Sequence, residues 1–155
     1  MVQQASQVRD VTGDLFAADV DALVNPVNCV GVMGKGLALQ FKQRFPASYA
    51  VYRHACGQGE MAPGRVQVVL ARKGRHRYVI NFPTKRHWRE PSRLEDVEAG
   101  LQDLADKVRG LRIGSIAVPA LGCGLGGLEW SIVRPRIEQV LGATRARVLI
   151  YGPRS

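Results

Sequence analysis

The sequence predicts an α/β fold, a three-layer α/β/α sandwich with a mixed six-stranded sheet. Three observations support this prediction. About six short apolar segments alternate with segments of helical periodicity, the pattern of a sheet that helices cover on both faces. The 155 residues suit one domain, because single cores usually comprise about 100–200 residues. Two glycine-rich loops each follow an apparent strand and precede a helix, where ligands of such sheets commonly bind.

Six segments have strand patterns, with apolar residues that alternate or run together between turn residues. They are residues 7–11, 20–24, 66–70, 78–82, 113–119 and 147–151. The third and fourth can form a hairpin, because only the basic turn at 72–77 separates them.

Four segments have helical periodicity, and they begin near residues 37, 47, 94 and 131. Pro46 separates the first two. Ser92 and Glu95 form a capping box for the third helix, which an apolar stripe continues. Ser131 can cap the fourth, and Pro135 is expected within its first turn, where a missing N–H is least harmful.

Composition places the chain among globular proteins, with 46% hydrophobic and 23% charged residues. No apolar run approaches the roughly 20 residues that span a bilayer, and no basic segment followed by a hydrophobic stretch opens the chain. We therefore expect a cytoplasmic protein with no membrane partner. Cys29, Cys56 and Cys123 lack C-x-x-C spacing, so reduced thiols and no metal or cofactor are expected.

The net charge of +9 points to a polyanionic partner. A polyanion gains free energy by releasing its counterions on such a surface, so nucleic acid is the leading candidate. The alternative is a solvated, arginine-rich surface that reflects biased composition. Charge by itself does not identify a site.

The first glycine loop is residues 31–36 and the second is residues 122–127. Backbone N–H groups in such loops can approach phosphate closely and use the positive end of the following helix. One such loop would be weak support, and neither matches the P-loop or the G-x-G-x-x-G spacing. The presence of two loops predicts a ligand with two phosphates.

Four motifs occur in order: Gly13-Asp14-Leu15-Phe16, Asn25-Pro26-Val27-Asn28, the first glycine loop, and Pro119-Ala120-Leu121-Gly122-Cys123-Gly124. Together they resemble the macrodomain family. The resemblance runs from about residue 8 to residue 151, so we expect residues 1–155 to form a single macrodomain. The abrupt end hints at the N-terminal domain of a longer protein, although a short natural protein would look the same.

Three further segments, residues 34–38, 81–85 and 125–130, resemble the macrodomain branch that contains the DarG antitoxins and the terminal ADP-ribose glycohydrolase. The resemblance implies hydrolysis of mono-ADP-ribose from thymine in DNA, which reverses the attack of a DNA ADP-ribosyltransferase toxin. The expected partners are ADP-ribose and single-stranded ADP-ribosylated DNA. Two other functions stay open: hydrolysis of ADP-ribose esters on protein carboxylates, and a reader that binds ADP-ribose without turnover.

The resemblance also implies the contacts with ADP-ribose. They are Asp14, Leu15, Asn28, Gly31, Val32, Met33, Gly34, Lys35, Gly36, Pro119, Leu121, Gly122, Cys123, Gly124, Leu125, Gly126 and Tyr151. Asp14 would accept from the adenine amino group, although a turn-forming role is common for Asp. Tyr151 would stack on the adenine or fill the core. Asn28 would bind the distal ribose, Asn25 is read as structural, and Cys123 contributes its backbone rather than a nucleophilic thiol.

Lys85 aligns with the lysine that these glycohydrolases need for cleavage at the anomeric carbon of the distal ribose. An amine is nucleophilic only when deprotonated, so a catalytic Lys85 requires a lowered pKa, which Arg86 and the net charge would favour. The alternative is a solvated lysine that opens a basic surface loop.

One position departs from the branch. The terminal glycohydrolase pairs its lysine with an aspartate in the second loop, where this chain has Gly126. Either Lys85 works with water and Asn28, or Glu129 supplies the carboxylate.

Residues 85–89 have a second possible use in binding nucleic acid. Trp88 can stack on an exposed base while Arg86 and Arg89 hold phosphates. The alternative is a loop whose tryptophan packs down onto the domain.

Overall fold

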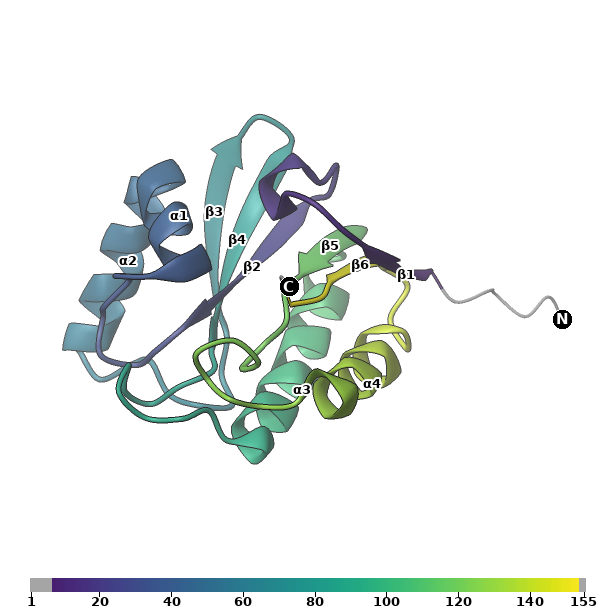
Figure 1. Ribbon diagram of the computed structural model, residues 1–155. Helices are drawn as coiled ribbons and strands as arrows, with labels where there is room; N and C mark the ends of the chain where they lie inside the picture. Colours follow the sequence, from purple (N-terminus) through teal and green to yellow (C-terminus); the bar gives the residue numbers. More distant parts are fainter. Residues whose placement is uncertain (1–6, 154–155) are drawn as a thin grey trace, which may run out of the picture.

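The structure is a computed structural model that describes residues 7–153, the side chain of Arg72 excepted. Figure 1 labels its strands and α-helices, which are β1 (Val8–Val11), β2 (Ala22–Val27), α1 (Gly36–Arg44), α2 (Pro46–Gly57), β3 (Gln67–Lys73), β4 (His76–Pro83), α3 (Leu94–Gly110), β5 (Ser115–Val118), α4 (Trp130–Leu141) and β6 (Arg147–Tyr151). A short 3-10 helix (Leu15–Ala17) lies between β1 and β2. All six predicted strands and all four predicted helices are present within this range.

The strands form one sheet in the order β1-β6-β5-β2-β4-β3. Only β3 is antiparallel to its neighbour, β4, and the other neighbouring pairs are parallel. The predicted mixed sheet and hairpin are therefore confirmed. The five mutually parallel strands end at one edge of the sheet, which we call the carboxyl edge.

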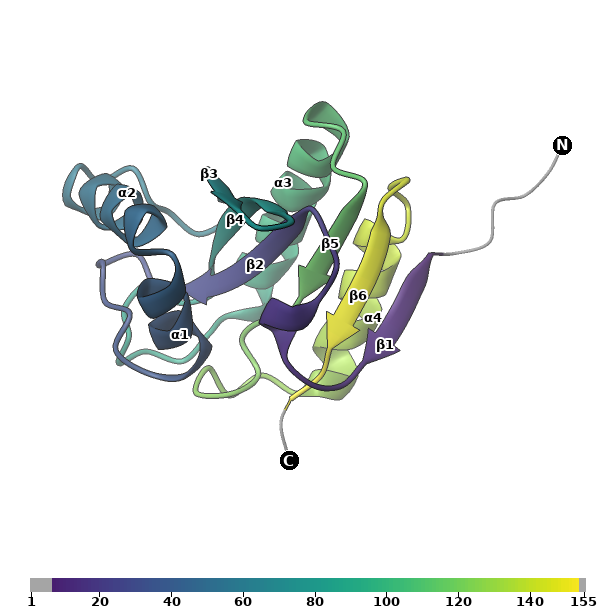
Figure 2. The same ribbon diagram turned by 90° about the horizontal axis from the view of Figure 1, so that it is seen from above.

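Helices cover both faces of the sheet, α1 and α2 on one and α3 and α4 on the other (Figure 2). Alternate residues of each strand enter different cores because strand side chains point to opposite faces. Val24 and Ile80 pack in the core beneath α3 and α4. Their neighbours Leu23 and Val79 pack with Phe41 of α1. The three-layer sandwich is thus confirmed.

β2 starts later and ends later than the predicted strand at 20–24. It includes Asn25 and Pro26, which lie beyond the predicted segment. Along β2, only Ala22 and Leu23 pair with β5, so the second half of the strand has β4 as its single neighbour. Proline is tolerated in a strand under that condition.

Both predicted helix caps are wrong. Arg93 precedes α3, and no side chain caps it. Ser92 lies one residue before the cap position, and its backbone N–H donates to the Gly126 carbonyl at 2.9 Å. Glu129, rather than Ser131, precedes α4, and Pro135 lies inside that helix, beyond its first turn.

Candidate functional site

The carboxyl edge gathers the predicted site residues, although they are far apart in sequence. β1, β2, β4, β5 and β6 end there, and the segments that follow these strands carry the proposed contacts. In Figure 2 the arrowheads of β2, β5 and β6 point toward this edge. The site is built from the loops after these strands and from Tyr151, the last residue of β6.

Asn28 organises the first glycine loop. Its side-chain oxygen accepts from the backbone N–H groups of Val30 and Gly31 at 3.1 Å and of Val32 at 3.3 Å. Its amide nitrogen donates to the Val32 carbonyl at 2.8 Å. Most of the hydrogen-bonding capacity predicted to serve the distal ribose is therefore used to hold the loop.

Tyr52 supports Asn28, a role that was not predicted from the sequence. It is fully buried on α2, and its hydroxyl lies 2.8 Å from the Asn28 carbonyl and 2.9 Å from the Asn28 side-chain oxygen. Burial raises the pKa of this phenol well above its usual value, so it stays a donor. The available signal was weak: a tyrosine buried in a helix needs a partner for its hydroxyl.

The outer part of the first glycine loop faces solvent. Val32 and Lys35 are exposed, while Met33 is buried beneath them. Helix α1 begins at Gly36, and no side chain caps its N-terminus. Free N–H groups at a helix start, beside an exposed lysine, favour an anionic ligand.

The second glycine loop is shaped by close backbone packing. Gly122 has φ +74°, a conformation that favours glycine. Leu128 N–H donates to the Gly122 carbonyl at 2.9 Å, and the Gly126 carbonyl accepts from Ser92. The loop is thereby tied both to itself and to the segment that precedes α3.

Position 126 has no room for a side chain. A Cβ there would lie within 3.0 Å of the Ser92 hydroxyl oxygen and of the Gly122 carbonyl, closer than real Cβ atoms approach. The aspartate of the terminal glycohydrolase therefore cannot be accommodated in this loop as it stands. Glu129, the other candidate acid, is exposed and forms no ion pair within residues 7–153.

The three cysteines are free thiols. Burial raises the pKa of Cys123 to about 11, and its thiol lies 3.5 Å from the Leu121 carbonyl. A thiol with this pKa is protonated at neutral pH, which favours the backbone role over nucleophilic attack. Across the described residues, no group of three or more His, Cys, Asp or Glu could hold a metal ion.

Lys85 lies directly beside the start of the first glycine loop. The Val27 carbonyl accepts from the backbone N–H of Thr84 at 2.8 Å and of Lys85 at 3.4 Å. Cys29 N–H in turn donates to the Arg86 carbonyl at 3.3 Å. The Lys85 side chain is partly exposed, and its amine lies 3.4 Å from the Trp88 carbonyl.

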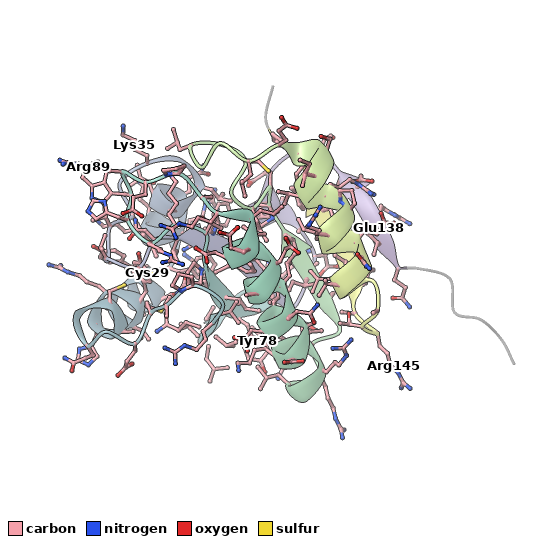
Figure 3. The ribbon with its side chains drawn as sticks, turned by 90° about the horizontal axis from the view of Figure 1, so that it is seen from below. Cys29, Lys35, Tyr78, Arg89, Glu138 and Arg145 are labelled. Carbon is pink, nitrogen blue, oxygen red and sulfur yellow. The ribbon has the colours of Figure 1, made fainter. Side chains whose placement is uncertain are left out.

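Arg86 and Arg89 occupy different environments. The Arg86 guanidinium donates two hydrogen bonds of 3.3 Å to Asp96 of α3, and these bonds raise the pKa of Arg86. Its charge is thus compensated, which leaves Arg89 as the more available phosphate ligand. Figure 3 shows Arg89 projecting outward, at the same end of the molecule as Lys35.

Trp88 is half-exposed, with 46% of its surface accessible, so part of its ring is open to a ligand. The Arg89 guanidinium lies 4.6 Å from its ring centroid. Val30, Val32 and Leu125 from the two glycine-loop regions are also exposed. Apolar groups thus surround the site at the carboxyl edge, as a binding surface requires.

Asp14 and Tyr151 lie together at the β1–β6 side. One carboxylate oxygen of Asp14 accepts from Phe16 N–H at 3.0 Å. Burial, and then the nearby Asp14 charge, raise the pKa of the Tyr151 phenol. Leu15 is buried in the core, so only its backbone is available to a ligand.

Comparison with known proteins places this geometry in a family. Residues 24–137 match the family model of the Macro domain. The chain is 51% identical over 148 residues to a DNA ADP-ribosyl glycohydrolase of Thermus aquaticus, covering 94% of this chain and 41% of that protein. It is 41% identical over 159 residues to a DNA ADP-ribosyl transferase–DNA ADP-ribosyl glycohydrolase fusion protein of Thermosipho africanus, covering 92% and 41% respectively.

Solved structures that resemble this chain belong to the same group of proteins as these relatives. The macrodomain of Mycobacterium tuberculosis DarG superposes with a TM-score of 0.94 at 46% identity, covering 97% of this chain and all of that one. Thermosipho africanus DarTG in complex with ADP-ribose gives a TM-score of 0.91 at 39% identity, covering 96% and 42%. The chain spans about two fifths of the length of the curated relatives it matches. On the family model and these identities, the chain belongs to the macrodomain family.

Proposed function

We propose that this macrodomain is a DNA ADP-ribosyl glycohydrolase that removes mono-ADP-ribose from thymine and counteracts a DNA ADP-ribosyltransferase toxin. The observation that carries the proposal is the backbone hydrogen bond from Lys85 to the carbonyl of Val27, at the end of β2 that leads into the first glycine loop. The Lys85 backbone thereby lies next to the segment that leads into this loop, from where we expect the amine to reach the ribose. The activity and the toxin partner are inferred from the Thermus aquaticus DNA ADP-ribosyl glycohydrolase and the Thermosipho africanus fusion protein.

Bound ADP-ribose would lie along the carboxyl edge. Asp14 and Tyr151 would receive the adenine, and the two glycine loops would hold the diphosphate from opposite sides. Asn28 supports this arrangement indirectly, since its amide fixes the loop backbone. We infer that its contribution to catalysis is the position of that loop.

Cleavage breaks the bond between the anomeric carbon of the distal ribose and the modified base. In the covalent route the deprotonated Lys85 amine attacks that carbon, the bonding electrons leave with the base, and water later releases the ribose. In the direct route water attacks, and the Lys85 amine orients it. The absence of space for an acid at position 126 favours a reaction centred on Lys85 and water.

The cellular setting is part of the proposal. No helix within residues 7–153 is long and apolar enough to cross a membrane. A DNA substrate and reduced thiols suit the cytoplasm of a bacterium. We propose that location.

The decisive experiment compares the wild type with Lys85→Ala on single-stranded DNA that carries ADP-ribose on thymine. We expect release of ADP-ribose to fall by about 100-fold or more, the range for loss of a group that acts in the chemical step. Affinity for free ADP-ribose, measured by calorimetry, should change little. Lys107→Ala, on α3 and paired with Asp103, is the matched control and should keep full turnover.

A reader that binds ADP-ribose without turnover is the second candidate, favoured by the glycine at position 126. Wild-type protein that binds ADP-ribose but releases none from DNA would establish the reader instead. A parallel assay on an ADP-ribosylated protein ester separates the two hydrolases. We expect faster turnover of the DNA substrate, given the net charge of +9.

A further inference from the structure

The net charge is confined to one part of the chain. Residues 22–89 contain twelve Lys and Arg but a single acid, Glu60, so this segment carries a net charge of +11. The remaining residues contain ten Lys and Arg and twelve acids, a net charge of −2. Between residues 22 and 59 there is no acid at all.

The basic segment, residues 22–89, is also separated from α3 and α4 in the folded molecule. Residues 22–89 form β2, α1, α2, β3 and β4, which lie together on one side of the molecule, whereas α3 and α4 lie on the other (Figure 1). Within α3 and α4 every Lys and Arg is paired with an acid, for example Arg136 with Glu98 and Arg109 with Asp106. In the described part of the chain, no Lys or Arg of α1 or α2 forms an ion pair.

A hollow of about 400 Å³ opens on α2 within this cationic side. It is lined by Tyr49, Ala50, Arg53, His54, Gly57 and Gln58. The Lys42 ammonium of α1 lies 4.7 Å from the Tyr49 ring centroid. We call Lys42 and these lining residues the α1–α2 face. It combines two cations and an aromatic ring with no carboxylate.

The α1–α2 face is continuous with the proposed ligand site. The Tyr49 hydroxyl lies 3.5 Å from the Gly31 carbonyl in the first glycine loop. A Cβ on Gly31 would lie 3.7 Å from the Arg53 Cγ. A strand whose modified nucleotide occupied the site could therefore pass from the first glycine loop directly onto this face.

We propose that single-stranded DNA runs from the site across the α1–α2 face, with its phosphates on Lys42 and Arg53 and a neighbouring nucleotide in the hollow. This inference rests on the proposed DNA substrate. Cations without internal partners exchange condensed counterions for phosphates, and an aromatic ring beside them suits a base that is not stacked in a duplex. The cations of α3 and α4, by contrast, are all paired with carboxylates.

The test reverses two charges on each side of the molecule. The double variant Lys42→Glu/Arg53→Glu is compared with Arg9→Glu/Arg145→Glu, in which exposed arginines of β1 and of the segment before β6 are changed. Figure 3 shows Arg145 at the end of the molecule opposite Lys35. Both variants fall from +9 to +5, since each substitution removes two charges. Thermal unfolding verifies that each is folded.

Fluorescence anisotropy measures binding of an unmodified single-stranded oligonucleotide over a range of salt concentrations. For the α1–α2 variant we expect at least a tenfold loss of affinity at low salt. The slope of log affinity against log salt should become less steep by about 1.4, since each phosphate contact contributes about 0.7 on a single strand. Equal losses in both variants would mean that binding follows net charge alone, and the proposal would be wrong. The alanine pair Lys42→Ala/Arg53→Ala should shift the slope in the same direction.

A short substrate separates this proposal from the proposed function. With an ADP-ribosylated thymidine mononucleotide, the α1–α2 variant should retain wild-type turnover, whereas turnover of the long oligonucleotide should fall. If the wild type releases nothing from either substrate, the proposed activity fails, and the anisotropy comparison still decides where DNA binds. Equal loss on both substrates would place Lys42 and Arg53 in the ligand site instead and overturn the docking path.

Discussion

The two glycine loops look alike in sequence but are held in different ways. The first is fixed by side chains from outside it, because the Asn28 amide binds its backbone and the Tyr52 hydroxyl binds Asn28. The second is held by close backbone packing, because Gly126 lies against Ser92 and the Gly122 backbone with no space for a Cβ.

This difference separates two uses of glycine. In the first loop a Cβ on Gly34 would make only an ordinary contact, at 3.6 Å from Val32 Cγ1. That glycine leaves the backbone uncovered for a ligand without being required by packing. In the second loop the glycines at 122 and 126 are required by packing itself. Gly34 should thus tolerate substitution better than Asn28, whereas Gly126 should not tolerate it.

The largest effect is expected for Gly126→Asp. The new Cβ would collide with a backbone carbonyl, which cannot move aside like the end of a flexible side chain. Overpacking costs about 1–3 kcal/mol and occasionally more, and a collision with backbone at a buried position belongs at the upper end, about 3 kcal/mol. We expect the free energy of unfolding to fall by that amount, and the affinity for ADP-ribose to fall by about tenfold or more as the loop shifts. Chemical denaturation and calorimetry measure the two quantities.

Gly124→Ala is the matched control for Gly126→Asp. A Cβ at position 124 meets nothing within 4 Å, so stability and affinity should stay near wild type. If Gly126→Asp instead gained turnover on ADP-ribosylated DNA, the loop would have accepted the carboxylate. The packing explanation for this departure from the branch would then be wrong.

The next largest effect is expected for Asn28→Ala. The substitution removes the acceptor of the Val30, Gly31 and Val32 N–H groups and one of the two acceptors of the buried Tyr52 hydroxyl. Loss of several such bonds should lower the free energy of unfolding by about 2–3 kcal/mol even without ligand, given about 1 kcal/mol for each. Denaturation of the ligand-free protein checks this. Unchanged stability with weakened ADP-ribose binding would show that Asn28 acts on the ribose directly.

The fold was predictable because its signals are local. Period-two apolar segments and helical stripes depend on neighbours in sequence, so the six strands and four α-helices of residues 7–153 were found, whereas the short 3-10 helix Leu15–Ala17 was not. The predictions of the helix caps were wrong because capping also depends on contacts between residues far apart in the sequence. Ser92 has the residue type and spacing of a cap, but its N–H is bonded to Gly126. No local pattern reports a bond over that separation.

The site was predictable only to the level of which loops take part. The motifs that resemble the macrodomain family identified these loops, and the strand order of the sheet explains why the loops meet at one edge. The role of Tyr52 could not be read, because it depends on how α2 packs behind the first glycine loop. The pairing of Arg86 with Asp96 was hidden for the same reason, since it joins the Lys85 loop to α3.

A smaller effect is expected for Tyr52→Phe. The ring would keep its packing, and only the hydroxyl that donates to Asn28 would be lost. One buried hydrogen bond contributes about 1 kcal/mol, so the free energy of unfolding should fall by that amount. Affinity for ADP-ribose should weaken less than in Asn28→Ala, because the amide still holds the loop. A loss as large as that of Asn28→Ala would make Tyr52 the principal support.

The smallest effect is expected for Ser92→Ala, and its sign is informative. The Ser92 hydroxyl is buried and has no hydrogen-bond partner among residues 7–153. An unsatisfied buried polar group costs free energy, so its removal should leave stability unchanged or raise it by up to about 1 kcal/mol. A clear decrease would mean that the hydroxyl has a partner in solution, and weaker ADP-ribose binding would assign that partner to the ligand. Combined with Gly126→Ala, Ser92→Ala should give little rescue, because the Gly122 carbonyl still occupies the space that the new Cβ needs.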